Sequence, residues 1–471
     1  MTHGMSMKPL FAQIPITILC LIIAGLAQTR MAVAQAPLQN ALGDQNIASF
    51  WTYDNLDLGI KRARETGKPL LVTIRCVPCH ACRGMDQKVV NPTDLQLLTL
   101  MNQFVSVRIV QAWGLDLSLF QYDMNQSWAA FFMNADGVIY GRYGTRAAQR
   151  DETAITIEGF SKALDGAVDL HRRYLIEPTK VKADLSGKIG PKPRWEKPDD
   201  IPVIQNTVRW GKPIGRMTDS KQTECLHCHF VPAADMMSML DAGDPITDQT
   251  LWAYPLPETV GWTLDPSEKA TITKVAMGTQ AEKAGFQAGD AIIEIEQQAI
   301  ISIADVQWIL HQAGEVDSLS VEIKRNDKQI SIELPLETGW RRRDEFASRV
   351  SSWDFFKVKL FGVNQLESLS DSESAELEIA KEQTALRIVK LAPSWGGINQ
   401  DVRKAGLEEG DIIVQVDEQK TLSNHSEILA YLVQKKRSGD HLNLVVLREG
   451  IRTKISVPLD WSNRLQALRK P

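Results

Sequence analysis

The sequence contains an internal repeat near its C-terminal end. The stretch EKAGFQAGDAIIEIEQQAI is echoed by RKAGLEEGDIIVQVDEQKT, and the aspartates of the two Gly-Asp pairs, Asp290 and Asp411, are 411 − 290 = 121 residues apart. In each copy Ala-Gly-x-x-x-Gly-Asp leads into a short apolar run, 291–295 or 412–416, which is typical of a turn that enters a buried strand. A helix-like stretch and a final strand region follow in both copies. The sequence therefore predicts two copies of one module.

The repeated module resembles PDZ domains of the bacterial, secreted kind. In that family a Gly-containing loop precedes the peptide-binding edge, and the candidate loops here are VGWTL and LFGVN. The resemblance implies that a polypeptide C-terminus or extended peptide adds as a strand beside Gly261 and Trp262 or beside Gly362 and Val363, with loop N–H groups receiving the carboxylate. Neither loop carries the Gly-Leu-Gly-Phe string of the family. The alternative is that one copy only packs against its neighbour.

The N-terminus has the pattern of an export signal. An apolar run covers residues 14–27, and the small residues Ala32-Val33-Ala34 follow it. The run is shorter than the roughly 20 residues that a membrane span needs, so it predicts a secretory signal, residues 1–34, that is cleaved after Ala34. An uncleaved anchor is the alternative. No later stretch is apolar enough to span a membrane, and the expected location is the periplasm or another exported compartment.

Composition bounds the remaining possibilities. The 471 residues suggest three or four domains, and the net charge of −5 is accompanied by no basic tract suited to nucleic acid. The stretch IEPTKVKADLSGKIGPKPRWEKPDDIPVIQ, residues 176–205, is rich in Pro, Lys and Asp and has little apolar periodicity. It is interpreted as a linker.

The cysteines form two clusters. Of the six cysteines, Cys20 lies within the signal, which leaves 6 − 1 = 5 in the mature chain. So few cysteines exclude a disulfide scaffold. Paired cysteines two residues apart in an exported chain are typical of redox groups, metal ligands or haem anchors, so each cluster needs its own interpretation.

The first cluster lies in TGKPLLVTIRCVPCHACRGMD, which resembles the thioredoxin superfamily. Alignment through Lys68-Pro69 and Met85 places the Cys-x-x-Cys motif of that family on Cys79 and Cys82. A cysteine at a helix N-terminus gains a lowered pKa from the helix dipole and the unpaired amides, so Cys79 is the expected nucleophile and Cys82 the resolving thiol. Cys76 is a candidate spare resolving thiol.

Two alternatives and two departures accompany this assignment. Cys76 with Cys79 is the other possible redox pair, and the three cysteines with His80 form a candidate zinc site. Trp128 occupies the position of the cis-proline of thioredoxins, and Thr73 occupies that of their buried carboxylate. These departures put general dithiol reduction in doubt, because a bulky Trp would narrow access and the carboxylate is a proton acceptor.

The second cluster is CLHCH, the attachment signature of c-type haem. Its spacing places Cys225 and Cys228 against the two vinyl groups of one porphyrin, while His229 reaches the iron as an axial ligand. Haem of this type is attached after export, which agrees with the predicted signal. The alternative is a zinc knuckle formed by the same cysteines with His227 and His229.

Together these features predict a multi-domain chain, α/β in its first part and β-rich in its last. The expected units are a signal peptide (1–34), a thioredoxin-like domain (38–176), a linker with a haem-binding segment (177–254) and two PDZ-like domains (255–337 and 338–461). This order resembles exported bacterial thioredoxin/PDZ proteins, some of which are thought to carry selenocysteine where this chain has cysteine. The resemblance implies a periplasmic thiol–disulfide redox protein with covalent haem, whose PDZ modules hold a partner polypeptide. The alternative is a non-catalytic PDZ adaptor or a haem-based redox sensor.

Overall fold

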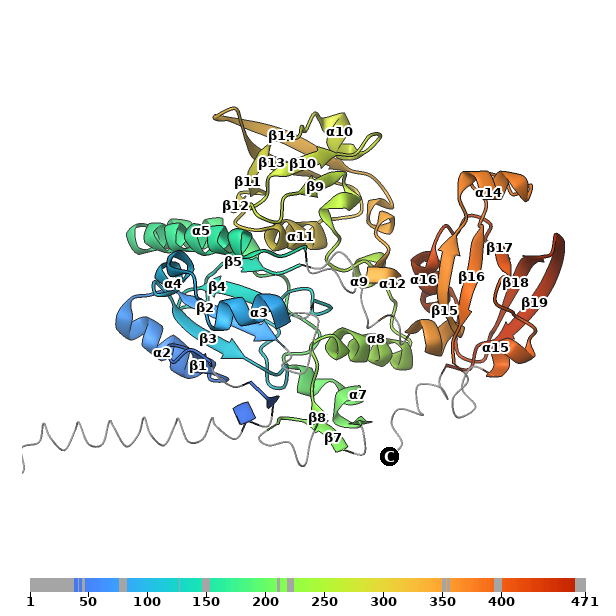
Figure 1. Ribbon diagram of the computed structural model, residues 1–471, viewed down its shortest axis with the longest axis horizontal. Helices are drawn as coiled ribbons and strands as arrows, with labels where there is room; N and C mark the ends of the chain where they lie inside the picture. The colour runs from blue at the N-terminus through green and yellow to red at the C-terminus, as the bar shows by residue number, and fades with distance from the viewer. Residues whose placement is uncertain are drawn as a thin grey trace, which may run out of the picture.

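The structure is a computed structural model that describes residues 38–40, 42–44, 47–75, 83–126, 128–145, 153–209, 212–217, 224–349, 353, 356–393 and 400–461. Figure 1 shows an N-terminal domain at the left, the first repeat above it and the second repeat at the right, with helix α8 below the first repeat and between the other two units. Within the described ranges no helix is both long and apolar enough to cross a membrane. The predicted signal peptide lies outside them.

The N-terminal domain is built on a five-stranded sheet with the order β1-β3-β2-β4-β5. The strands are β1 (Thr52–Tyr53), β2 (Leu70–Arg75), β3 (Val105–Ile109), β4 (Trp128–Met133) and β5 (Ile139–Tyr143). Strands β1, β3 and β2 run parallel to one another. Strand β4 is antiparallel to β2, and β5 is antiparallel to β4. Every residue of β2 and β4 is buried, as expected for central strands covered on both faces.

Helices cover both faces of this sheet. They are α2 (Leu56–Thr66), α3 (Arg83–Val90), α4 (Leu95–Met101) and α5 (Ile157–Ile176). Apolar residues of α3, α4 and α5 share one core cluster with Leu71, Ala130 and Phe132. The opposite face, which carries Val72 and Phe131, shares its cluster with α2 and with the middle segment, residues 177–254.

The middle segment is folded and packed, unlike the linker predicted for residues 176–205. Its elements are α6 (Pro178–Asp184), α7 (Pro202–Gln205), β6 (Val208–Arg209), β7 (Lys212–Gly215), β8 (Glu224–Cys225), α8 (Phe230–Ala242) and α9 (Asp248–Leu251). Val181, Leu185 and Ile201 are almost completely buried although they show no periodicity. Their burial depends on surfaces supplied by other domains, which a local pattern cannot reveal.

The first repeat contains two short sheets that a bridge between Thr271 and Ala291 joins. Its elements are β9 (Trp262–Leu264), β10 (Ile272–Val275), α10 (Gln280–Ala284), β11 (Ala291–Ile295), β12 (Gln298–Ala299), α11 (Ile303–Gln312), β13 (Asp317–Arg325) and β14 (Lys328–Leu336). The predicted apolar run at 291–295 is confirmed as strand β11.

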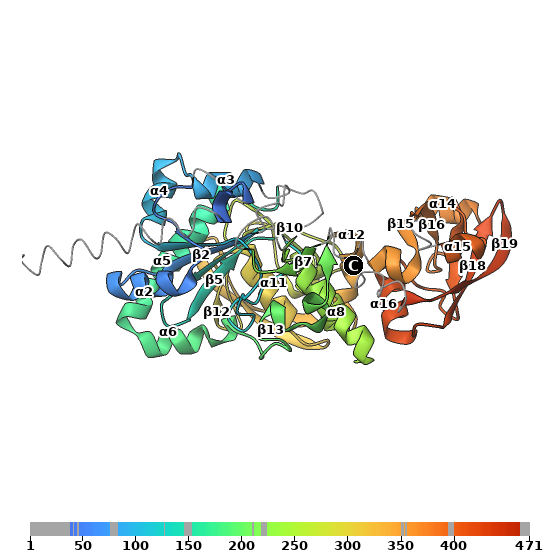
Figure 2. The ribbon, with the colours of Figure 1, turned by 90° about the horizontal axis from the view of Figure 1, so that it is seen from below.

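The second repeat forms one sheet with the order β15-β16-β17-β18-β19. After α12 (Phe346–Arg349) and the π-helical turn η6 (Lys357–Phe361), its elements are β15 (Val363–Ser368), α14 (Asp371–Glu376), β16 (Leu386–Leu391), α15 (Gln400–Lys404), β17 (Ile412–Val416), α16 (His425–Lys435), β18 (His441–Arg448) and β19 (Ile451–Pro458). The predicted run at 412–416 is confirmed as strand β17. In Figure 2 this repeat lies at one end of the molecule.

The Gly-Asp turns carry the same ion-pair clamp in both repeats. In the first repeat, Arg325 of β13 binds Asp290 with Nε–Oδ1 at 2.6 Å and Nη2–Oδ2 at 2.7 Å. In the second, Arg448 of β18 binds Asp411 with the corresponding distances of 2.6 and 2.8 Å. Bidentate arginine–carboxylate pairs fix both position and orientation. The shared clamp therefore explains why an aspartate recurs directly before β11 and β17.

The first repeat is docked closely on the N-terminal domain. Helix α11 packs against β5, where the hydroxyl of Ser302 donates to the carbonyl oxygen of Arg142 and the Arg142 N–H donates to Asp305 at 3.2 Å. Glycine permits the close approach at α5, because a Cβ on Gly159 would lie 2.2 Å from the carbonyl oxygen of Pro266. The contact therefore has the tight packing of a domain interior.

Candidate functional site

The first cysteine cluster connects two elements of the N-terminal domain. Strand β2 ends at Arg75, and the described part of α3 begins at Arg83. Cys76, Cys79 and Cys82, together with His80, lie outside the described residues. The predicted roles of these cysteines therefore stay predictions, and what the structure describes is the two ends to which their segment is attached.

A buried charged network joins these two ends. Asp86 of α3 accepts hydrogen bonds from Arg75 Nη1 at 2.5 Å, from Arg108 Nη1 at 2.8 Å and from Trp128 Nε1 at 3.1 Å. Arg108 also binds Asp44 through Nε at 2.8 Å. We name Asp44, Arg75, Asp86, Arg108 and Trp128 the Asp86 network. In it, the positive charges of two arginines are balanced by two carboxylates. Burial lowers the pKa of Arg108, but its hydrogen bonds to Asp86 and Asp44 outweigh burial, so its pKa lies above the usual range.

The Asp86 network shows how Thr73 and Trp128, the two residues that depart from the thioredoxin pattern, are accommodated. Thr73 is fully buried on β2, where its hydroxyl lies 3.5 Å from the carbonyl oxygen of Val107. The buried carboxylate comes instead from α3, as Asp86. The ring of Trp128 is buried, packs edge-on against Phe160 and donates to Asp86, so it serves as a core residue between β4 and α3. Sequence reasoning missed Asp86 because its three partners come from three different strands, β2, β3 and β4.

The second cysteine cluster lies at the junction of β8 and α8. Cys225, 2% exposed, packs in a small cluster with Tyr53, Val110 and Met217, whereas Cys228, 4% exposed, belongs to the main core. Both thiols are buried. His229 is the residue that precedes α8, and its ring lies 5.5 Å from that of His227.

This packing does not fit a covalent haem. Both thioether bonds must form on one porphyrin, but the two thiols are buried in different apolar clusters. Attachment would require both thiols to leave these clusters. A zinc knuckle has no preformed ligand set either, since no group of three or more His, Cys, Asp or Glu side chains among the described residues is placed to hold a metal ion. Haem and zinc at this segment therefore stay predictions, and no chemical step is assigned to them.

The predicted peptide-binding loop of the first repeat is closed. The N–H groups of residues 259–261 each donate to the carbonyl oxygen three residues earlier. Gly261 adopts a φ of +105°, and the ring of Trp262 is buried against Phe286 at 5.0 Å between centroids. The Gly261 N–H is thus engaged within the turn. Carboxylate capture at Gly261 and Trp262 stays a prediction that requires this turn to open.

The helix beside that loop is buried on all sides. All seven residues 304–310 of α11 are less than a tenth exposed, including Asp305 and Gln307. Gln307 Nε2 donates to the carbonyl oxygen of Tyr254 at 3.3 Å, so the chain that enters the repeat covers this face of the helix. In PDZ domains an extended peptide needs an open sheet edge. The geometry of the first repeat therefore favours packing over peptide binding.

The second repeat has an open sheet edge. Strand β15 is the outermost strand of its sheet, and among the described residues only β16 pairs with it. Gln365, Glu367 and Ser368 of β15 are exposed. The Gly362 N–H donates to Lys357 at 2.9 Å, so this loop glycine is engaged within the turn as in the first repeat. Strand β9 of the first repeat is also outermost in its described sheet, but it has three residues, whereas β15, which begins at the predicted site residue Val363, has six.

A buried imidazole lies beside this turn. His425 begins α16, and its ring lies 6.2 Å from that of Phe361. Its Nε2 atom is buried and has no hydrogen-bond partner among the described residues. Burial, and then the charge of Lys357, lower the pKa of His425 to about 3. The imidazole is therefore neutral, and one polar nitrogen is left for a ligand or a water molecule to satisfy.

The fold and these sites define a chain with a thioredoxin-like domain and a PDZ domain. The family model described as "Thioredoxin-like" matches residues 51–135, and the model described as "PDZ domain" matches residues 239–336. The second match covers the first repeat. The second repeat lies outside both matches, and its likeness to the first repeat rests on its strand order and on the Asp411 clamp.

Among curated proteins, the chain is similar to a "Probable periplasmic serine endoprotease DegP-like" of Marinomonas sp. (strain MWYL1). The two are 27% identical over 187 residues, which are 40% of this chain and 36% of that protein. The chain thus spans about a third of the length of this relative. Among solved structures it is similar to the HtrA-type protease AlgW with a tripeptide (16% identity, 30% of this chain, 44% of that chain, TM-score 0.19) and with a decapeptide (15%, 30%, 41%, TM-score 0.18).

Proposed function

We propose that the protein is an exported thiol–disulfide exchange protein that holds a partner polypeptide through its second repeat. The observation that carries the redox part is the position of the first cysteine cluster, between the end of β2 and α3 of a thioredoxin-like domain. Export is inferred from the N-terminal pattern, and the periplasmic name of the DegP-like relative is consistent with it. Nothing in this proposal depends on haem.

The proposed chemistry uses two thiols in sequence. The Cys79 thiolate attacks a disulfide of the partner, forms a mixed disulfide and releases one partner thiolate. The Cys82 thiolate then attacks the Cys79 sulfur, which forms the Cys79–Cys82 disulfide and releases the second partner thiol. Two electrons pass from the dithiol to the partner disulfide, and the reverse sequence oxidises a partner dithiol. An external thiol or disulfide resets the pair.

Exchange with glutathione disulfide tests this assignment. The reduced full-length protein should release free glutathione and acquire a Cys79–Cys82 disulfide, which peptide mapping identifies. Cys79→Ser should abolish the release, whereas Cys82→Ser should stop at a glutathione adduct on Cys79. Cys76→Ser is the matched control and should exchange normally. A disulfide between Cys76 and Cys79, with Cys82 dispensable, would contradict the assignment.

The second candidate function is a non-catalytic adaptor that carries out no thiol–disulfide exchange. Thr73 and Trp128 favour it, since neither residue reproduces the thioredoxin pattern. It predicts that all three cysteine variants behave like the unmodified protein toward glutathione disulfide while peptide binding persists. The same assay therefore separates the two functions.

For the second repeat, we propose that an extended polypeptide adds as a strand to the free edge of β15. Main-chain hydrogen bonds would supply the affinity, as in other edge-strand complexes. Because the Gly362 N–H is already engaged, capture of a terminal carboxylate contributes less than the strand pairing. Peptides selected from a library should therefore bind with similar affinity whether their C-terminus is free or amidated.

A loop substitution tests where the peptide binds. Gly362→Ala should weaken peptide binding at least tenfold, because Gly362 has a φ of +75° and a side chain there strains the entry to β15. Gly278→Ala is the matched control: its φ is +74°, it lies in the first repeat and an added Cβ meets nothing within 4 Å. Equal binding by both variants would contradict binding at β15, and the absence of any selected peptide would favour a packing role for both repeats.

A further inference from the structure

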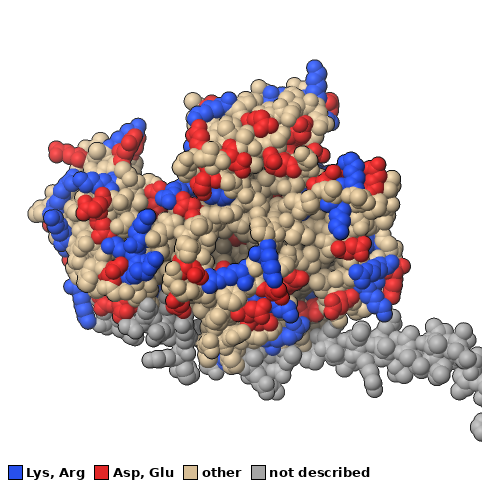
Figure 3. Space-filling model, turned by 180° about the vertical axis from the view of Figure 1, so that it is seen from behind, with Lys and Arg blue, Asp and Glu red and all other residues tan. Residues whose placement is uncertain are grey.

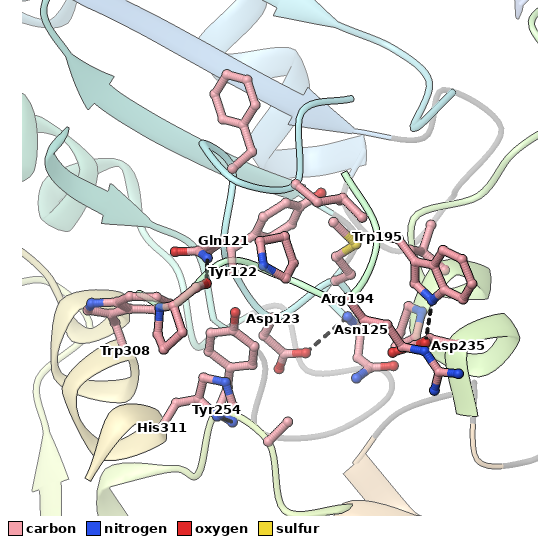
Figure 4. A pocket seen from close by; sticks show the side chains of 18 of the residues that line it. Gln121, Tyr122, Asp123, Asn125, Arg194, Trp195, Asp235, Tyr254, Trp308 and His311 are labelled. Atoms are coloured by element: carbon pink, nitrogen blue, oxygen red, sulfur yellow. Dashed lines mark hydrogen bonds between the residues drawn. The ribbon is translucent and has the colours of Figure 1, made fainter. Parts of the chain in front are cut away.

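A cavity of about 400 Å³ lies where the N-terminal domain, the middle segment and the first repeat meet. Its walls come from the loop between β3 and β4, the stretch 191–195, helix α8 and helix α11. Figure 4 shows side chains from all these parts converging on the same space. Its volume lies within the range of small-molecule sites, which is roughly 300–1,000 Å³. None of its described lining residues is a cysteine or belongs to the second repeat.

Aromatic rings form much of the cavity wall. Trp195, Tyr254 and Trp308 line it from three segments of the chain. Tyr254 stacks on His311 with their centroids 4.2 Å apart, and Arg142 lies behind Trp308 at 4.0 Å from the ring. These contacts hold the rings in place. Faces of aromatic rings attract cations as well as apolar groups.

Asp235 of α8 places a carboxylate in this wall. Its Oδ1 accepts a hydrogen bond from Trp195 Nε1 at 2.7 Å, as Figure 4 shows. Among the described residues no cation lies within ion-pair distance of it. The nearby guanidinium of Arg194 instead binds Asp244 at 2.7 Å. Burial raises the pKa of Asp235, and the hydrogen bond from Trp195 and the charge of Arg194 offset this rise only in part.

The other polar groups of the cavity do not neutralise Asp235. Asp123 accepts the Asn125 N–H at 3.0 Å and lies 3.8 Å from Arg349, so its charge is partly compensated. The hydroxyl of Tyr254 points into the cavity and forms no hydrogen bond with a described residue. Burial, and then the charges of Arg341 and Arg142, lower the pKa of His311 to about 3, so this imidazole is neutral. The cavity therefore presents the Asp235 and Asp123 carboxylates within aromatic walls, and its lining cation, Arg194, is paired with Asp244.

We propose that this cavity binds a small organic cation, with an ammonium or amidinium group at the Asp235 carboxylate and an apolar body against Tyr254 and Trp308. A half-buried carboxylate is stabilised when a cation shares its site, and the aromatic faces favour the same charge. The Tyr254 hydroxyl offers a further hydrogen bond to the ligand. This inference is independent of the thiol chemistry proposed above.

Binding of 4-aminobenzamidine to the full-length protein tests the proposal, with 4-aminobenzamide as its neutral isostere. Calorimetric titration should show saturable binding of one amidine per chain, and the amide should bind at least tenfold more weakly. This comparison on the unmodified protein tests the charge without any variant. Equal affinity for both compounds, or no binding of the amidine at millimolar concentration, would overturn the proposal.

An Asp235→Asn variant tests the location. Asn keeps an oxygen that can accept from Trp195 Nε1, so the wall is expected to persist, which an unchanged melting temperature verifies. The variant should bind the amidine at least tenfold more weakly and the amide unchanged. Asp327→Asn removes one negative charge at an exposed position outside the cavity and should bind both compounds normally. Full amidine affinity in Asp235→Asn would refute the assigned position.

Discussion

At the scale of single residues, buried carboxylates matched by arginines determine much of the local geometry. Asp86, Asp290 and Asp411 are all buried, and each binds an arginine from a neighbouring strand. Removing one partner of a buried pair leaves an uncompensated charge, which costs far more than the pair contributes. These aspartates are therefore the positions at which a change of one charge has the largest structural effect.

Asp86→Asn should destabilise the N-terminal domain strongly. Arg75 and Arg108 would lose their shared carboxylate inside the core, for which we expect a loss of about 3–5 kcal/mol in the free energy of unfolding. Denaturant unfolding monitored by tryptophan fluorescence measures it. Asp169→Asn, which removes a carboxylate from an exposed pair with Arg172, should change stability by less than about 1 kcal/mol. Equal stability of the two variants would contradict the role of Asp86.

His311 should contribute to acid sensitivity. Its pKa is about 3 in the folded chain, against about 6.5 when unfolded, so below pH 6.5 the unfolded chain binds a proton that the folded chain does not. Its contribution to stability is therefore lost as pH falls from about 6.5 toward 3, at about 1.4 kcal/mol per pH unit.

His311→Gln should reduce that slope, whereas Gln312→Ala, an uncharged change next to it, should not. Free energies of unfolding measured between pH 7 and pH 5 give the two slopes. Identical slopes for His311→Gln and the unmodified protein would show that the imidazole is not buried in its neutral form.

At the scale of elements, the same strands and turns serve different ends in the two repeats. The Gly-Asp turns, β11 and β17 are equivalent, and so are the clamps of Arg325 and Arg448. The surroundings of the two repeats differ. Helix α11 of the first repeat is enclosed by the N-terminal domain, whereas strand β15 of the second repeat keeps an open edge. The two repeats therefore share one module, and the contacts of each repeat with the rest of the chain determine whether a peptide can reach it.

The element formed by β8 and α8 gives a direct test of the second cysteine cluster. Because both thiols are buried, Cys225 and Cys228 should resist maleimide labelling in the native protein and react after unfolding. If the two thiols are also buried in the exported protein, its pyridine haemochrome spectrum should show no covalent haem. A haemochrome band that disappears in the Cys225→Ala and Cys228→Ala double variant would establish haem attachment and a different packing of this segment.

At the scale of the whole molecule, the first repeat joins the N-terminal domain into one packed unit. Lys188 of the middle segment and Asp305 of α11 form an ion pair at 3.0 Å, and both side chains are fully buried. On the face drawn in Figure 3, Lys and Arg are interspersed with Asp and Glu. The domains are thus held together by interior contacts.

Asp305→Asn should loosen this junction. Lys188 would be left buried without a carboxylate, and we expect a loss of about 3–5 kcal/mol in the free energy of unfolding. Hydrogen exchange should rise at α11 and β5 together. Glu196→Gln, at an exposed pair with Lys192, should leave both measurements nearly unchanged. Exchange that rises in α11 alone would mean that the two domains are not coupled through this pair.

The sequence by itself determined the parts whose signals are contiguous along the chain. The repeated turns, the strands at 291–295 and 412–416 and the buried strand that begins at Leu70 follow from apolar runs and turn residues within a few positions of each other. The order of the domains follows from the same local patterns.

Only the tertiary structure decided which surfaces are closed and which groups meet. Asp86 meets Arg108 and Trp128, Asp235 meets Trp195, and Lys188 meets Asp305, in each case across tens of residues or more. Whether the edge of a repeat stays open likewise depends on what another domain places against it. Such contacts depend on how distant segments pack, because burial and charge compensation are properties of the folded surroundings and not of the local sequence.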